Sequence, residues 1–433
     1  DQSHLAARAR FLKTAHPLPT TRSQVLSTHI LPIENFVTHL ECSQSGKHYR
    51  RNTQLNLSDV GKPLLVRYDL KAIKAAVSPA ALNQRPQDLW RYQELLPLTQ
   101  TPISLGESVT PLLSCQYLAR ALDLGEVLIK DEGRLPTGSF KARGIAMAVN
   151  LAKSLGVQRM AIPTNGNAGA ALAAYCAAAQ IEAICFCPDD TLQVNLQEMA
   201  YYGAKTFRVK GLINDCGKLV KQGADQGLWF DTATLKEPYR IEGKKTMGLE
   251  LAEQLNWILP DAIFYPTGGG TGLIGMWKAF AELEALGWID SRRPKMIAVQ
   301  ADTCAPIVKA FHTGADHAEL WPEAQTVASG IRVPIAIGDF LILKALRESQ
   351  GTAIAVTDEE ILESQKNLAK QTGILLCPEG AATAAALIKA RQNGTITIDA
   401  KVVLFNCASG LKYPMPGLVQ TFEPGQDIAT VLD

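Results

Sequence analysis

One lysine of this chain stands among residue types that suit covalent chemistry. Lys141 lies in the segment 136–144, between a turn of small, hydroxyl-bearing residues and an alanine-rich stretch that predicts a helix over 144–155. A lysine at such a boundary is better placed for the floor of a site than for a solvated surface. A site-facing amine loses its proton easily and becomes a nucleophile toward aldehydes. Because most lysines face solvent, Lys141 alone does not predict a Schiff base, and further motifs are needed as evidence.

Two glycine-containing loops follow strand-like apolar runs and open helices of small residues. The first is Pro-Thr-Asn-Gly-Asn-Ala-Gly at 163–169, and the second is Pro-Thr-Gly-Gly-Gly-Thr-Gly at 266–272. In an open α/β sheet, ligands bind outside the carboxyl ends of the strands. Glycines let backbone N–H groups converge at a positively polarised helix start, so the second loop predicts a phosphate cradle. Taken alone, the first loop fits tight packing as well as ligand binding.

The predicted phosphate loop matches neither common nucleotide motif. Residues 268–272 lack the Lys-Ser/Thr of a Walker loop, and their spacing is not Gly-x-Gly-x-x-Gly with a later acidic residue. A phosphate site combined with a distant reactive lysine points instead to a phosphorylated aldehyde, pyridoxal 5'-phosphate.

These motifs together resemble a known family. The run Pro-Thr-Gly-Ser-Phe-Lys-Ala-Arg-Gly at 136–144 and the triple-glycine loop resemble the threonine synthase branch of the pyridoxal-phosphate enzymes of tryptophan-synthase-β fold type. Similar segments are Gly-Glu-x-x-Thr-Pro-Leu at 106–112, Arg-x-Glu-Gly-x-Lys-Thr at 240–246 and Gly-Leu-Lys at 410–412. The resemblance covers roughly residues 91–413.

The resemblance implies a role for each matched residue, with Lys141 as the catalytic residue and Schiff-base partner of the cofactor. The other implied cofactor contacts are Phe140, Asn167, Gly268, Gly269, Gly270, Thr271, Gly272, Glu379, Cys407 and Ser409. The implied substrate contacts are Ser139, Thr164, Asn165, Gly166, Asn167 and Arg240. For Glu379, a contact to the cofactor ring and a simple helix cap both fit the sequence.

Three positions depart from the family pattern. Ala142 follows the lysine where Asp is frequent, Cys407 replaces the Thr that faces the pyridine nitrogen, and Glu237 replaces an Asn near the substrate phosphate. A thiol is a weaker donor and acceptor than a hydroxyl, so either Cys407 or Ser409 is expected to face the ring nitrogen. A carboxylate repels a phosphate dianion unless a cation offsets it, so Glu237 keeps other substrates open.

Composition argues against several other classes. The net charge of +1, from 43 basic and 42 acidic residues, does not suit a nucleic-acid binder. No apolar run approaches a membrane span, and no segment has the layout of a signal peptide. Nine scattered cysteines, mostly in apolar runs, are typical of reduced thiols, so we expect a cytoplasmic protein.

The sequence predicts no metal site. The segment 40–49 has the turn of the small zinc ribbon that related enzymes carry, but it holds only Cys42, so it is interpreted as a metal-free hairpin. Five of the seven histidines precede residue 50 and none falls in a motif loop, so all seven are interpreted as surface or packing residues.

The alternation of elements predicts an α/β fold with two open, twisted parallel-sheet αβα domains, the cofactor between them, and an N-terminal extension. The expected domains are an N-terminal segment (1–82), a large cofactor-binding domain (83–143 and 235–433) and a small closing domain (144–234). Expected strands include 127–130, 159–163, 181–188, 204–209, 262–265, 295–300, 352–356, 374–377 and 401–406, and expected helices include 86–98, 243–255 and 358–371.

The predicted activity is a pyridoxal-phosphate-dependent lyase or synthase acting on a small amino acid with a leaving group at its β or γ carbon. The resemblance implies a homodimer that converts O-phosphohomoserine and water to threonine and phosphate. A serine/threonine ammonia-lyase or β-replacement enzyme is the first alternative. A cofactor-binding module without turnover is the second.

Overall fold

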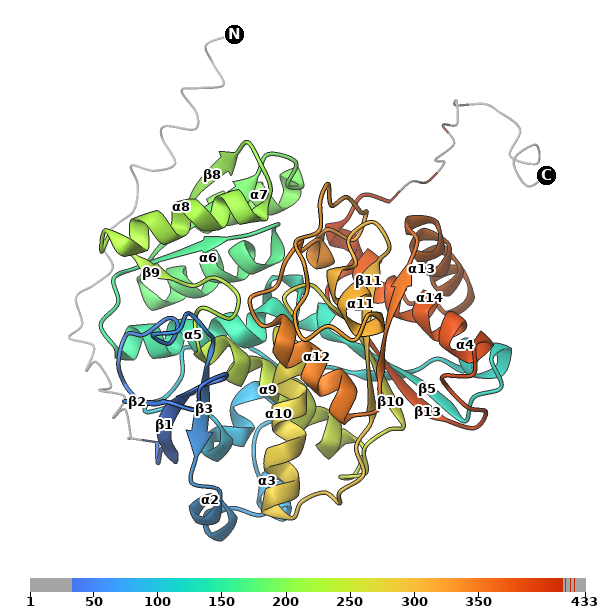
Figure 1. The fold of residues 1–433 in the computed structure, drawn as a ribbon, viewed down its shortest axis with the longest axis horizontal. Helices are drawn as coiled ribbons and strands as arrows, with labels where there is room; N and C mark the ends of the chain where they lie inside the picture. The colour runs from blue at the N-terminus through green and yellow to red at the C-terminus, as the bar shows by residue number, and fades with distance from the viewer. Residues whose placement is uncertain (1–32, 416, 418–420, 422–423, 425–433) are drawn as a thin grey trace. The chain divides into compact units, whose positions relative to one another are not determined.

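The computed structural model describes residues 33–415, 417, 421 and 424, and its strands form three sheets (Figure 1). The sheet orders are β12-β11-β10-β13-β5-β4, β8-β7-β6-β9 and β2-β1-β3. The strands are β1 (Val37–Cys42), β2 (His48–Tyr49), β3 (Leu64–Tyr68), β4 (Leu112–Ser114), β5 (Glu126–Asp131), β6 (Arg159–Pro163), β7 (Glu182–Pro188), β8 (Lys205–Val209), β9 (Phe230–Asp231), β10 (Ala262–Pro266), β11 (Lys295–Ala301), β12 (Thr352–Val356) and β13 (Lys401–Asn406).

Helices connect most of these strands. The α-helices are α2 (Leu70–Ala76), α3 (Pro79–Leu82), α4 (Gln116–Ala121), α5 (Lys141–Ser154), α6 (Asn167–Ala179), α7 (Gln193–Tyr201), α8 (Ile213–Asp225), α9 (Tyr239–Gln254), α10 (Thr271–Leu286), α11 (Pro306–His312), α12 (Asp339–Glu348), α13 (Asp358–Thr372) and α14 (Pro378–Gln392). Short 3-10 turns are η1 (Leu89–Leu95), η2 (Glu132–Arg134), η3 (Pro136–Gly138), η4 (Ser329–Ile331) and η5 (Gly410–Lys412). None of the helices within the described residues is both long and apolar enough to cross a bilayer.

The six-stranded sheet is buried on both faces. On β13, Val402 and Leu404 belong to one hydrophobic cluster with α14, while Val403 and Phe405 belong to another with α9 and α10. This alternation follows from the two-residue period of a strand. Parallel strands need helical crossovers, and these crossovers cover the two faces.

The four-stranded sheet is built in the same way. Its neighbouring strands are all parallel. Ala161 and Ile184 pack with Val220 of α8, whereas Met160 and Ile162 pack on the side of α6. The expected fold class, two open parallel-sheet layers with helices on both faces, is therefore confirmed.

The three-stranded sheet is antiparallel and packs on helices of the main body. Leu40 and Val66 are fully buried in a cluster with Met147 and Leu151 of α5 and Tyr239 of α9. The hairpin expected at 40–49 thus forms from β1 and β2. The first 32 residues of the expected N-terminal segment lie outside the described residues.

Four expectations about elements were wrong. Residues 374–377 form no strand but only an isolated bridge between Leu376 and Ser409, and 86–98 contains a 3-10 turn in place of a helix. The short edge strand β4 was not foreseen and runs antiparallel to β5. Helices α5 and α9 begin at Lys141 and Tyr239, three and four residues earlier than expected from positions 144 and 243, because glycines inside their first turns hid the helical pattern.

Candidate active site

A cavity of about 460 Å³ lies where the expected motifs meet. Its wall includes Lys141, the loop after β6, the loop after β10 and Cys407, which follows β13. These segments come from the carboxyl ends of parallel strands in two different sheets. Ligands of open α/β sheets bind at such ends. The expected contacts on this wall are Phe140, Lys141, Thr164, Asn165, Gly166, Asn167, Arg240, Gly268, Gly269, Gly270, Thr271, Gly272 and Cys407.

Lys141 is the first residue of α5, and its amine is buried away from water. Burial lowers the pKa of Lys141; the charge of Arg240 lowers it further, while Cys407 and Glu379 oppose the shift. An amine with a lowered pKa is more often neutral at pH 7 and therefore more nucleophilic. The position of Lys141 thus suits attack on an aldehyde.

A buried ionic network fixes the helix that carries Lys141. Arg143 donates to Glu132 through Nε (2.6 Å) and Nη2 (2.8 Å), and to Glu250 through Nη1 (2.9 Å). Thr110 donates to Glu132 over 2.7 Å, and Lys130 also pairs with Glu250. Burial alone would raise the pKa of Glu250, but Arg143 and Lys130 lower it to about 2. Paired buried charges with several hydrogen bonds resist displacement, so the start of α5 is rigid.

The turn before Lys141 is joined to the end of β13. Phe140 N donates to Cys407 O over 2.9 Å, and Ser409 N donates to Gly138 O over 2.8 Å. An isolated bridge pairs Ser139 with Ala408. Lys141 and Cys407 therefore lie on backbone segments that are hydrogen-bonded to each other.

The triple-glycine loop ends at the N-terminus of α10. Gly270 has φ 72° and immediately precedes Thr271, the first residue of the helix. A Cβ at Gly270 would lie 2.2 Å from Ile342 Cδ1, so packing also requires glycine there. The free N–H groups at a helix start attract anions, and this one opens into the cavity.

The loop after β6 is held by its own hydroxyl and by a distant segment. Thr164 Oγ1 accepts from the N–H groups of Gly166 (3.0 Å) and Gly169 (2.9 Å). Asn165 Nδ2 donates to Ser329 O and Arg332 O, each over 3.2 Å. Thr164 therefore shapes the turn, while Asn165 ties the loop to the segment around η4.

Several buried polar atoms around the cavity have no hydrogen-bond partner among the described residues. They include Ser139 Oγ, Asn165 Oδ1, Asn167 Oδ1, Lys244 Nζ and Glu379 Oε2. Buried polar atoms are almost always paired, so such a group of unpaired atoms indicates a missing polar molecule. A cofactor with a phosphate, a phenolic oxygen and a ring nitrogen fits this environment.

Arg240 brings a buried guanidinium to the cavity wall. Its Nη1 donates to Thr232 O over 2.7 Å, and burial lowers its pKa to about 10 against the charges of Glu237 and Asp231. Glu237 itself is not on the cavity wall, since its Oε2 accepts from Arg240 N over 2.7 Å. Burial raises the pKa of Glu237 to about 7. The residue therefore precedes α9, accepts a hydrogen bond from the first turn of that helix and is not part of the cavity wall.

Three expected site residues do not form part of the cavity wall: Ser139, Glu379 and Ser409. Glu379 Oε1 accepts from Gly330 N over 2.6 Å, and Ser409 Oγ accepts from Leu411 N over 3.3 Å. Cys407 does line the cavity, with its Sγ 3.6 Å from Cys377 Sγ.

Sequence reasoning missed one residue close to Lys141. Lys244 on α9 lines the cavity, is only 3% exposed, and its Nζ lies 3.1 Å from the centre of the Phe140 ring. It occupies the unspecified position of the Arg-x-Glu-Gly-x-Lys-Thr segment, so the motif gave no signal for it.

Comparisons with known proteins identify the family of the chain. The family model described as pyridoxal-phosphate dependent enzyme matches residues 103–408, and the chain belongs to that family. It is a pyridoxal-phosphate-dependent enzyme of fold type II.

Within that class, the chain is similar to curated threonine synthases. The threonine synthase of Methanocaldococcus jannaschii is 37% identical over 386 residues, which is 88% of this chain and 95% of the relative. The threonine synthase of Methanosarcina acetivorans is 36% identical, covering 89% of this chain and 95% of the relative. Among solved structures, a diaminopropionate ammonia lyase from Escherichia coli has a TM-score of 0.61 at 19% identity, covering 71% of this chain and 86% of that one. The last similarity concerns the fold alone.

Proposed function

We propose that this chain is a threonine synthase that converts O-phosphohomoserine and water to threonine and phosphate. The choice of substrate rests on Arg240, whose guanidinium is buried on the cavity wall. The same cavity has a separate anion site at the N-terminus of α10. A cofactor phosphate occupies one anion site, so the second suits a substrate with its own phosphate. The two curated relatives at 36–37% identity support the same function.

Specific residues are assigned to the cofactor in this proposal. Lys141 binds its aldehyde carbon, Gly268 to Gly272 bind its phosphate, and Asn167 donates to its phenolic oxygen. Cys407 faces the pyridine nitrogen, because its thiol reaches the cavity wall whereas Ser409 caps a turn. Phe140 packs near the ring, and Glu379 and Ser139 support the neighbouring loops. When bound, the cofactor supplies an electron sink for the carbon atoms next to the amino group.

The chain's own residues then orient the substrate and control a proton. The N–H groups of Asn165 and Asn167 bind the carboxylate, because those of Thr164 and Gly166 already donate to Phe186 O and Thr164 Oγ1. Arg240 binds the distal phosphate by charge-assisted hydrogen bonds. Lys141 lines the cavity with a pKa lowered by burial, so its neutral amine would serve as the base for the proton on Cα. A thiol at the ring nitrogen, in place of a carboxylate, favours elimination and replacement over transamination.

The decisive test measures phosphate and threonine formed by the cofactor-loaded chain from O-phosphohomoserine. Lys141→Ala should lose turnover, and Arg240→Met should lower kcat/KM by about 10- to 100-fold, the value of a hydrogen bond to a charged group. Arg240→Lys should recover part of this loss. Release of ammonia from serine or threonine, without phosphate release from O-phosphohomoserine, would contradict the proposal and indicate an ammonia-lyase.

The alternative of a serine/threonine ammonia-lyase has only the shared fold behind it, and the similarity to the diaminopropionate ammonia lyase of Escherichia coli at 19% identity does not favour that activity. Glu237, which kept other substrates open in the sequence, lies away from the cavity wall and no longer weighs against a phosphorylated substrate.

We further propose the domain division 1–82, 83–143 with 235–433, and 144–234, in which the last unit closes over the substrate. A homodimer in the cytoplasm completes the proposal. All nine cysteines are free and buried, as is usual for proteins of reducing compartments. Light scattering coupled to size exclusion would measure the mass, and a mass near that of one 46.8 kDa chain would contradict the dimer.

A further inference from the structure

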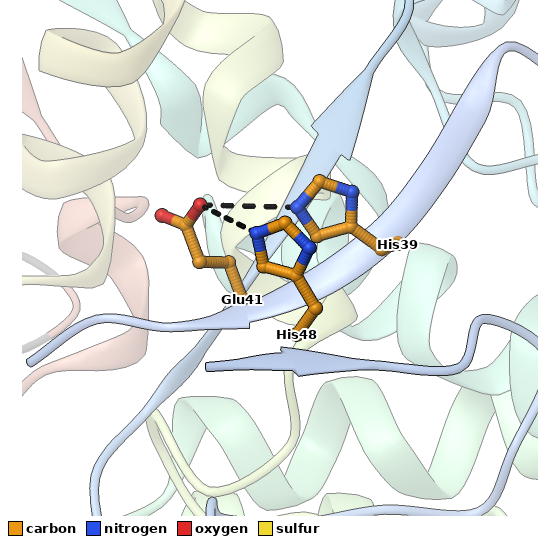
Figure 2. Close-up of side chains that lie close together, drawn as sticks. All are labelled: His39, Glu41 and His48. Carbon is orange, nitrogen blue, oxygen red and sulfur yellow. Dashed lines mark ion pairs between the residues drawn. The ribbon is translucent and has the colours of Figure 1, made fainter. Parts of the chain in front are cut away.

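Three potential metal ligands converge on one face of the N-terminal sheet, far along the chain from the motifs of the active site. His39 and Glu41 are two residues apart on β1, so their side chains share one face of the strand. Glu41 is paired with His48 of β2 in the antiparallel register. Directly opposed residues have adjacent side chains, and His39 is diagonal to the same pair. The strand pairing therefore brings all three side chains together, as Figure 2 shows.

The ligand atoms face one another. His39 Nε2 and His48 Nε2 each lie 3.8 Å from Glu41 Oε2, and all three ligand atoms lie within 4.8 Å of one another (Figure 2). The two imidazole rings are stacked with centroids 3.8 Å apart. Ligand atoms about 2.1 Å from a common zinc ion are separated by about 3.0 to 3.6 Å. Side-chain movements of about 1 Å or less therefore suffice to bind an ion.

Neighbouring groups orient His39 as a metal ligand. Thr38 Oγ1 donates to Arg67 O over 3.1 Å, so its oxygen is left to accept from His39 Nδ1 at 2.9 Å. In this neutral tautomer the lone pair is on Nε2. That atom is buried and has no hydrogen-bond partner in the described part of the chain. A metal-bound histidine normally donates its other ring N–H in this way.

Glu41 is oriented equally well. Arg67 donates to Glu41 Oε1 through Nε (3.1 Å) and Nη2 (2.6 Å), which fixes the carboxylate and leaves Oε2 toward the two imidazoles. Without a cation, Glu41 Oε2 and the unprotonated Nε2 of His39 would be two lone-pair donors facing each other with no proton between them.

We propose that His39, Glu41 and His48 bind one divalent first-row transition ion, for which Zn²⁺ is the representative, and that the ion joins β1 to β2. Two imidazoles and one carboxylate suit zinc and its neighbours. His48 is the most exposed ligand, with a side chain 64% exposed, so the ion keeps open positions for water. The sequence predicts no metal in this hairpin and indicates that both histidines are surface or packing residues, an interpretation that this proposal revises. His4, His16 and His29 lie outside the described residues.

The test uses the full chain, loaded with its cofactor, stripped with a chelator and dialysed against Zn²⁺. Elemental analysis should find one tightly held ion per chain. His48→Gln and Glu41→Gln should each weaken Zn²⁺ binding by at least about 10-fold, and Thr38→Val by about 10-fold through loss of the supporting contact. Zn²⁺ should also raise the Tm of the wild type, because it binds only the folded hairpin.

A matched control removes a histidine elsewhere. His317 is half exposed and contacts Asp339, so His317→Gln should retain both the bound ion and the shift in Tm. Enzyme activity is not used as the readout, so the outcome is independent of the proposed function. Two results would overturn the metal site: no zinc retained by the wild type, or equal zinc retained by His48→Gln.

Discussion

Lys244 gives the cavity a second primary amine beside Lys141. Its Nζ lacks a hydrogen-bond partner among the described residues and lies over the face of Phe140. Burial and the charge of Lys141 lower the pKa of Lys244 well below its usual value. A buried amine without a partner costs stability, and proteins retain such groups mainly at functional sites.

The substitution Lys244→Met should stabilise the cofactor-free protein by about 2 kcal/mol at pH 7, since Met fills the space without an unpaired donor. The same substitution should lower turnover, because Lys244 lines the cavity. The unfolded chain holds the proton that folded Lys244 has lost, so wild-type stability rises with pH toward about 10, the ordinary value for lysine. The advantage of the variant should shrink over that range. Urea unfolding at several pH values measures both effects, and a destabilised variant would contradict this account.

Glu237 provides a pH-dependent test of a different kind. Its pKa is raised to about 7, so folding holds a proton that the unfolded chain releases above about pH 4.5. Stability conferred by the protonated form is thus lost as pH rises from about 4.5 to 7.

Glu237→Gln should remove this loss while its amide oxygen still accepts from Arg240 N. Relative to the wild type, the variant should gain about 3 kcal/mol between about pH 5 and pH 8. Denaturant unfolding of the two proteins at both pH values gives the comparison. Parallel pH profiles would show that Glu237 is ionised in the folded protein throughout.

At the scale of elements, the ionic network of Arg143 couples η2, α5 and α9. Arg143→Met leaves Glu132 and Glu250 buried, with only Lys130 to offset them. Breaking a buried pair costs about 3 to 5 kcal/mol, and we expect that loss in urea unfolding together with weaker binding of pyridoxal phosphate.

A helix cap far from the cavity provides the control. Thr357 and Glu360 form a reciprocal capping box at the start of α13. Thr357→Ala should cost only about 1 kcal/mol and leave cofactor affinity unchanged. If Arg143→Met unfolds no more easily than Thr357→Ala, the network does not hold the helix of Lys141.

The same elements show what could be predicted from sequence. Lys141 and the triple-glycine loop could be predicted because turns and the alternation of strands and helices depend on residues that are neighbours in the sequence. The strands at 159–163 and 352–356 matched for the same reason. Lys244 and the partners of Asn165 depend on packing between distant helices and loops, which no local pattern encodes. The segment 374–377 is apolar like a strand, but its neighbours leave it only one bridge.

At the scale of the whole molecule, polar contacts connect the four-stranded sheet to the segment around η4. Asn165 donates to two carbonyls there, and Arg332 forms a two-point ion pair with Asp190 at 2.5 and 2.8 Å. The side chain of Asp190 is 52% exposed, so water screens the pair and its contribution is modest.

Arg332→Met should favour the open arrangement of the proposed closing unit. Amide hydrogen exchange over 163–169 should accelerate by about two- to five-fold, corresponding to the loss of one partly exposed ion pair. Lys205→Met removes an ion pair to Glu182 within the four-stranded sheet and should leave that exchange unchanged. An equal acceleration in both variants would indicate general loosening instead of opening.

The backbone hydrogen bonds between the turn at Gly138–Phe140 and the residues that follow β13 have a consequence for turnover. These bonds join the backbone segments of Lys141 and Cys407 to each other. Thr164 and Asn167 belong instead to the loop after β6 and the start of α6, in the proposed closing unit. In the proposed function, the spacing between the backbones of Lys141 and Cys407 therefore does not change when the proposed closing unit moves. Opening of that unit would admit a new substrate molecule without displacing either residue.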